Sequence, residues 1–203
     1  AMTPLRTAFD YDFTAASFCR DTFVGIAPMS VMGVLNGARY ITIDTENWQE
    51  LKRVMYGTDK KSYSLLSSTM AYNPIDNNTY SLQYNDGMSG MDWCIYNDEY
   101  DEMDKIAAFR GKYNVLTLAA VPDGGMFFIN WLGDLYRIDR KTARPTLVGS
   151  TGVLPVMYSQ SMVYDGRTGL FIWAAQTETG SELYAVNPET AETSLIGLSL
   201  IHI

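Results

Sequence analysis

The sequence predicts an all-β fold, a β-propeller or partial propeller with about four blades of four antiparallel strands each. Three observations carry this prediction. First, a pattern of four short apolar runs separated by turn residues occurs twice between Leu116 and Leu198. Second, comparable landmarks recur at intervals typical of propeller blades. Third, aromatic residues make up 13% of the chain, and short segments rich in Tyr and Thr favour strands over helices.

The two clearest copies of this pattern follow one another along the chain. The first contains LAAVPDGGMFFINW and then DLYRIDRKTARPTLVG; the second contains SMVYDGRTGLFIWA and then ELYAVNPETAETSLIG. Asp139 and Asn187 close the third strand of each copy and lie 48 residues apart. Asp44 lies 95 residues before Asp139, which is about two such intervals, and Asn97 follows the strand DWCIY close to the midpoint.

The elements follow in order along the chain. Residues 1–21 match no repeat, and form either an N-terminal arm or a strand that closes a ring by pairing with the last sheet. The first repeat is expected at about 22–59, with its first apolar stretch broken into two runs at Pro28. The others are expected at about 67–109, 113–151 and 157–200, with turns at Gly-, Pro-, Asn- and Asp-rich breaks.

The segments LYRID and KTARPTLVG, and LYAVN and ETAETSLIG, resemble the repeats of bacterial β-propeller proteins of the YVTN and quinoprotein-like type. The resemblance is clear over 116–198 and weaker upstream. It implies the fold far more than a function. The tryptophan-docking motifs of true quinoproteins, the Gly-His…Trp-Asp signature of WD repeats and the aspartate box of sialidases are missing from the sequence.

Such families hold more blades than four. The chain is therefore a fragment of a longer propeller, a small closed ring, or a half that completes itself by association. Exposed blade edges of an incomplete ring recruit partners, which predicts self-association.

Composition excludes several classes of partner. A net charge of −8 and an isoelectric point of 4.6 argue against nucleic acid, which needs a basic surface. The sequence has no run of about 18 apolar residues, so no membrane insertion is expected. The N-terminus lacks the apolar region of a signal peptide, although a leader removed earlier would leave no trace. The two cysteines, Cys19 and Cys94, are compatible with one disulfide or with two thiols.

Enzymatic motifs are missing from the sequence. The sole histidine, His202, stands next to the end of the chain, where a general base would be poorly positioned. The sequence contains no nucleophile elbow, zinc-binding motif, P-loop or dinucleotide fingerprint, so we expect no catalytic residues and no cofactor.

Carboxylates are densest between 98 and 104. Oxygen ligands at alternating positions suit calcium, which makes Asp98, Asp101 and Asp104 weak metal candidates. The run lacks the central glycine of an EF-hand loop, so a solvated acidic turn is the favoured interpretation. Asp76, with Asn77 and Asn78, is read as a turn former.

Asp44, Asp139 and Asn187 have a structural role in this interpretation. A short side-chain oxygen at the end of a strand accepts backbone N–H bonds and holds a tight turn.

Three tryptophans are the candidate binding residues: Trp93, Trp131 and Trp173. Trp131 and Trp173 are expected to end equivalent second strands and to point alike. Packing between blades is the first expectation for them, as for Trp48. At a rim or channel their rings would stack on sugars or grip a peptide.

The favoured function is a non-enzymatic binding or scaffold domain that engages a protein or a glycan, in a secreted or surface protein of a bacterium and therefore extracytoplasmic. The alternative is a carbohydrate-active propeller hydrolase or lyase that uses central carboxylates. A third interpretation is a purely structural repeat within a larger surface protein.

Overall fold

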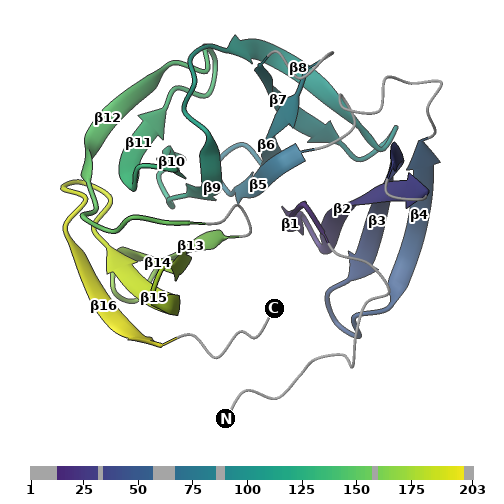
Figure 1. The fold of residues 1–203 in the computed structure, drawn as a ribbon. Coiled ribbons are helices and arrows are strands. Elements are labelled where there is room, and N and C mark those ends of the chain that lie inside the picture. Colours follow the sequence, from purple (N-terminus) through teal and green to yellow (C-terminus); the bar gives the residue numbers. More distant parts are fainter. Residues whose placement is uncertain (1–12, 32–33, 57–66, 86–89, 157–159, 199–203) are drawn as a thin grey trace. The chain divides into compact units, whose positions relative to one another are not determined.

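The computed structural model describes residues 13–31, 34–56, 67–85, 90–156 and 160–198. Within these residues the chain forms sixteen strands in four sheets of four, and no helix. Each sheet is a meander in which sequence neighbours pair, as in the blades of a β-propeller (Figure 1). The fold is therefore all-β, a β-propeller or partial propeller of four-stranded blades.

The chain divides into two compact units. The first comprises residues 1–72 and 77–105, and the second comprises 73–76 and 106–203. The first unit contains blade 1 and most of blade 2. Blade 1 consists of β1 (Ala15–Cys19), β2 (Thr22–Val31), β3 (Val34–Asp44) and β4 (Glu50–Tyr56). Blade 2 consists of β5 (Ser67–Asn73), β6 (Asn78–Tyr84), β7 (Met91–Asn97) and β8 (Glu102–Phe109).

The second unit contains blades 3 and 4. Blade 3 consists of β9 (Val115–Ala120), β10 (Met126–Asn130), β11 (Asp134–Ile138) and β12 (Pro145–Ser150). Blade 4 consists of β13 (Ser161–Asp165), β14 (Leu170–Thr177), β15 (Gly180–Val186) and β16 (Thr193–Leu198).

The first blade differs from its expected outline. Its sheet begins at Ala15, because β1 pairs antiparallel with β2. The stretch around Pro28 is not broken into two runs: β2 continues through Pro28, which lies opposite Ala38. Residues 1–12 and 199–203, on which closure of a ring was predicted to depend, lie outside the described part of the chain.

One turn recurs in all four blades between the third and fourth strands. An Asp or Asn closes the third strand, and its side-chain oxygen accepts the backbone N–H groups two and three residues later, at distances of 2.7–3.3 Å. The residue four positions later has a positive φ of 54–62°. The four leading residues are Asp44, Asn97, Asp139 and Asn187. The structural role predicted for three of them is confirmed, and Asn97 is the equivalent residue of blade 2.

Blades 3 and 4 share a buried core. Phe127, Ile129 and Leu135 of blade 3 pack against Phe171 and Trp173 of blade 4. Burying each such side chain contributes about 1.5–3 kcal/mol.

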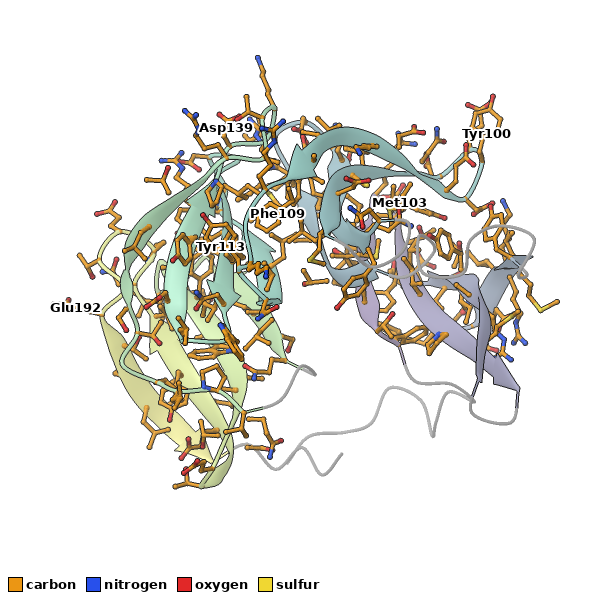
Figure 2. The ribbon with its side chains drawn as sticks, turned by 45° about the horizontal axis from the view of Figure 1, so that its top comes forward. Tyr100, Met103, Phe109, Tyr113, Asp139 and Glu192 are labelled. Carbon is orange, nitrogen blue, oxygen red and sulfur yellow. The ribbon has the colours of Figure 1, made fainter. Side chains whose placement is uncertain are left out.

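The other face of blade 3 is also aromatic. Phe128 and Tyr136 stack with ring centroids 5.0 Å apart, and the rings of Phe109 and Tyr113, both labelled in Figure 2, meet Phe128 edge-on. Blade 3 therefore buries apolar side chains on both of its faces.

Blade 1 and blade 2 share a separate core in the first unit. Ile26 and Tyr40 of blade 1 lie in one cluster with Met70 and Tyr96 of blade 2. Both cysteines are buried free thiols, Cys19 within this core, so the disulfide left open by the sequence is not formed. Burial raises the pKa of the Cys94 thiol to about 12.

The recurring turn generates the first prediction. Replacing Asn187 by Ala removes the acceptor for the N–H groups of Glu189 and Thr190, and should lower the free energy of unfolding by about 1 kcal/mol. Asn187→Asp keeps an acceptor oxygen and should retain most of the stability. Urea denaturation followed by fluorescence measures both, and equal stability of Asn187→Ala and the parent chain would contradict the role of the turn.

Candidate functional site

A polar groove of about 540 Å³ lies over the turns at one end of blade 3. The β9–β10 turn contributes Asp123 and Gly124, and the end of β11 contributes Arg137. The β11–β12 turn and the start of β12 complete the wall with Asp139, Arg140, Thr142, Arg144 and Thr146. We call this the arginine groove; Figure 2 labels Asp139 in the β11–β12 turn.

A second groove of similar volume adjoins it between blades 3 and 4. Blade 3 contributes an apolar wall that includes Val121, Phe127 and Val148, and blade 4 contributes Tyr164 and Pro188. We call this the apolar groove. Asp123 and Arg137 line both grooves, so the two form one continuous surface.

Strand register places Arg137 at the junction. It lies opposite Phe127 on β10 and opposite Thr146 on β12, so the three side chains share the face of blade 3 that meets blade 4. The guanidinium carbon lies 5.8 Å from the centre of the Phe127 ring. This contact helps to orient the guanidinium, and Arg137 remains exposed to solvent.

Charges in the arginine groove fall into two groups. Arg140 is paired with Asp76, and the Asp139 carboxylate accepts bonds from Lys141 and Thr142 in its own turn. Arg137 and Arg144 are exposed, and neither forms an ion pair among the described residues. Two guanidinium groups are therefore available to an anionic ligand.

No sequence motif singles out these arginines, although a comparison of the repeats distinguishes them. Arg137 precedes Asp139 by two positions and Arg144 follows it by five. The equivalent residues around Asn187 in blade 4 are Ala185 and Glu192, in a turn with the same backbone hydrogen bonds. The fold of the blade therefore does not require arginine at either position.

The three candidate tryptophans lie in different environments. Trp93 and Trp173 are 0% exposed: Trp93 stacks on Tyr80, with centroids 5.1 Å apart, and Trp173 belongs to the core between blades 3 and 4. Neither offers a free ring face. Trp131 is 51% exposed and follows the end of β10, so it does not share the environment of Trp173. None of the three lines either groove.

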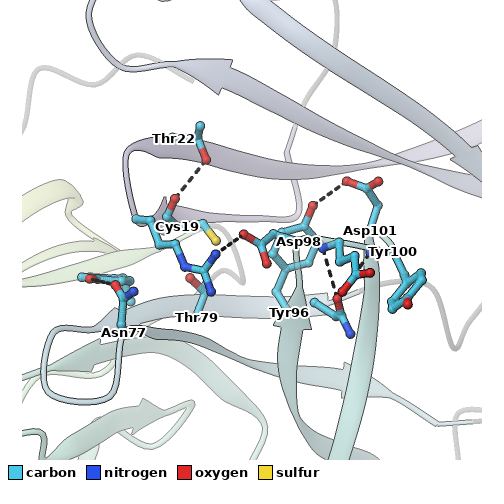
Figure 3. A network of polar contacts seen from close by, with 12 residues as sticks. Cys19, Thr22, Asn77, Thr79, Tyr96, Asp98, Tyr100 and Asp101 are labelled. Atoms are coloured by element: carbon cyan, nitrogen blue, oxygen red, sulfur yellow. Dashed lines mark hydrogen bonds and ion pairs between the residues drawn. The ribbon is translucent and has the colours of Figure 1, made fainter.

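The metal candidates each have a different polar partner, and Figure 3 labels Asp98 and Asp101. Asp98 pairs with Arg20 at 2.8 Å, and Asp104 accepts a bond from the Asn97 amide. Asp101 is 5% exposed, accepts a bond from the Tyr96 hydroxyl at 2.8 Å and pairs with Lys52. The described residues contain no group of three or more His, Cys, Asp and Glu side chains that could hold a metal ion.

The alternative of a carboxylate-based hydrolase or lyase is not favoured. A general acid needs a raised pKa. In the arginine groove, hydrogen bonds from the Thr142 hydroxyl and backbone instead hold the pKa of Asp139 below its ordinary value.

Comparison with known proteins supports the fold alone. A structural-genomics protein of unknown function from Bacteroides thetaiotaomicron has a TM-score of 0.65 and 12% identity, covering 92% of this chain and 43% of its own. A chain of the nidogen/laminin complex has a TM-score of 0.59 and 11% identity, covering 83% and 60%. An auxiliary nutrient binding protein from Bacteroides ovatus has a TM-score of 0.53 and 11% identity, covering 88% and 39%.

This chain therefore spans between 39% and 60% of the length of these structures. The sequence matches no protein-family model and no curated protein. In the described part of the chain no helix is long and apolar enough to cross a membrane.

The environments of the tryptophans generate the second prediction. Trp93→Ala should lower the free energy of unfolding by about 3–5 kcal/mol, because it leaves a cavity in a packed core. Trp131→Ala should change it by less than about 0.5 kcal/mol, because half of its side chain is already in water. Chemical denaturation of both variants tests this, and a large loss from Trp131→Ala would show that the exposed ring has a packing role.

Glu182 generates a third prediction. Its carboxylate accepts bonds from Tyr184 at 2.6 Å, Thr177 at 2.8 Å and Thr179 at 3.1 Å. These hydrogen bonds hold the pKa of Glu182 below its ordinary value of 4.5, and the bond from Tyr184 has the largest effect. Its stabilising contribution is therefore complete above pH 4.5 and is lost as the pH falls through the lower, folded-state pKa.

Glu182→Gln should accordingly melt at a lower temperature than the parent chain at pH 7, and the difference should vanish at strongly acidic pH. Glu178→Gln, at an exposed position of the same hairpin, is the matched control. Thermal melts across a pH series measure the effect, and a difference that is constant with pH would contradict it.

Proposed function

We propose that this chain is a non-enzymatic binding domain that engages a protein or a glycan through the two grooves on blades 3 and 4. The observation that carries the proposal is the junction at Arg137, where a guanidinium without an ion pair in the described part of the chain lines both the arginine groove and the apolar groove. Ligand sites commonly combine an apolar lining with a few well-placed polar groups. The surface lies on turns held by rigid sheets, where binding residues are usually found.

The structural neighbours are compatible with this role. One is named as an auxiliary nutrient binding protein and another belongs to a complex with laminin. At 11% identity they support a binding role only as examples of what the fold can do.

The proposal also covers the type of propeller repeat and the cellular location of the domain. The resemblance of the LYRID and LYAVN segments to YVTN and quinoprotein-like repeats supports a bacterial, extracytoplasmic binding domain. Self-association through blade edges remains a prediction.

Filling the groove tests the proposed function. The intact chain is applied to glycan and peptide arrays, and the ligands that bind are measured again with Thr146→Trp. Thr146 is exposed and lines the arginine groove, so an indole there should abolish binding while leaving the melting temperature within about 2 °C.

Ser194→Trp is the matched control. Ser194 occupies the equivalent position of β16, opposite Ala185, and lines neither groove. Loss of binding in Thr146→Trp alone supports the proposal. Binding that survives in Thr146→Trp, or that neither array detects, would overturn it.

A further inference from the structure

We propose that the ligand of these grooves is an acidic peptide segment of a partner protein. Its carboxylate binds Arg137 and Arg144, and a neighbouring apolar side chain enters the apolar groove. This inference rests on the proposed function, since it names the ligand class of the same surface.

The two arginines supply the anion preference. Guanidinium groups bind carboxylates through paired, charge-assisted hydrogen bonds that are among the strongest in proteins. The acidic side chains of the arginine groove do not compete for them: Asp139 is bonded within its turn, and Asp123 accepts the N–H of Gly125 at 2.8 Å. Asp76 is paired with Arg140.

The repeat shows that these cations are not part of the scaffold. Blade 4 builds the same turn with Ala185 and Glu192 at the two positions, and blade 1 builds it with Thr42 and Gln49 (Figure 2 labels Glu192). The chain as a whole has a net charge of −8. Two arginines without ion pairs to any residue that the structure describes, both beside the recurring turn of blade 3, reverse that charge locally. Such a reversal steers an acidic partner to this blade.

The apolar groove favours a peptide over a glycan. A sugar ring stacks on an exposed aromatic face. Phe127 is only 6% exposed and the guanidinium of Arg137 lies over its ring, while half-buried Tyr164 meets Phe171 edge-on at 5.9 Å. The remaining wall, which includes Val121, Val148 and Pro188, suits an aliphatic or aromatic side chain.

Charge also indicates which groove takes the acidic side chain. Glu189 is exposed and lines the apolar groove from blade 4, whereas Arg144 lines only the arginine groove. A carboxylate placed there would be repelled. The acidic residue therefore lies over Arg137 and Arg144, and the apolar residue lies near Pro188.

The test uses the intact chain and synthetic hexapeptides in which Asp alternates with Leu. Matched peptides carry Asn or Lys in place of Asp, and oligosaccharides of uronic acids represent acidic glycans. Calorimetry should detect binding of the Asp peptide, with a dissociation constant that rises as salt is added. The Asn and Lys peptides should bind at least about tenfold more weakly.

Arg137→Gln and Arg144→Gln should each raise the dissociation constant of the Asp peptide by about tenfold or more. Arg167→Gln is the matched control, because Arg167 is 93% exposed, belongs to blade 4, pairs within its own turn and lines neither groove. Melting temperatures of the variants show that they remain folded.

The outcomes separate this inference from the proposed function. Equal binding of Asp and Asn peptides, unchanged binding of the Asp peptide to both Arg137→Gln and Arg144→Gln, or binding of uronic-acid oligosaccharides without peptides would overturn the acidic-peptide assignment. The binding function would survive in each case if Thr146→Trp still abolished binding. Absence of binding to every probe would overturn both.

Discussion

Burial of two apolar faces per sheet is the constraint on which this structure depends. Blade 3 presents Ile129 and Leu135 to blade 4, while Phe128 and Tyr136 on its other face meet Phe109 and Tyr113. A four-stranded sheet with two such faces cannot be stable in water by itself, because neither face can be left exposed. Blades 3 and 4 therefore stabilise each other through one shared core, as blades 1 and 2 do through another, and the buried residues in these sheets have little freedom to vary.

The turns at the ends of the sheets can vary more in their amino-acid sequence. In the recurring turn, one Asp or Asn oxygen and a residue of positive φ determine the backbone, as seen from Asp44 to Asn187. The side chains two positions before and five positions after that residue do not contribute to it. This separation lets blade 3 carry Arg137 and Arg144 where blade 4 carries Ala185 and Glu192, without cost to the fold.

Repetition made the architecture predictable from the sequence. Alternation and turn residues repeated in LYRID and LYAVN indicate the third strands of blades 3 and 4, and the Asp or Asn that follows them has the structural role expected. The start of blade 1 was missed because Ala15–Cys19 has no counterpart with the same residue pattern. The break expected at Pro28 was wrong because proline is tolerated where pairing with Ala38 does not need its missing N–H.

The candidate site was less predictable, for a physical reason. Residue type suggested the tryptophans, but whether an indole is buried depends on which sheet packs on it, and Trp173 lies in a core formed with blade 3. The grooves join Arg137 to Tyr164 and Pro188, which come from different sheets. The spacing of residues along the chain does not show which residues of different sheets lie close together. Comparing the repeats position by position recovers the arginines but not the apolar wall beside them.

Because strands pair with their neighbours in sequence, each blade can begin to fold while the chain is being synthesised. Within each of the four meanders, a strand finds its partner across a short connection, so little loop-closure entropy opposes pairing. Contacts of small sequence separation form quickly. Each blade can therefore begin to form hairpins as soon as it leaves the ribosome, and the slower step is the docking of one finished sheet on the next.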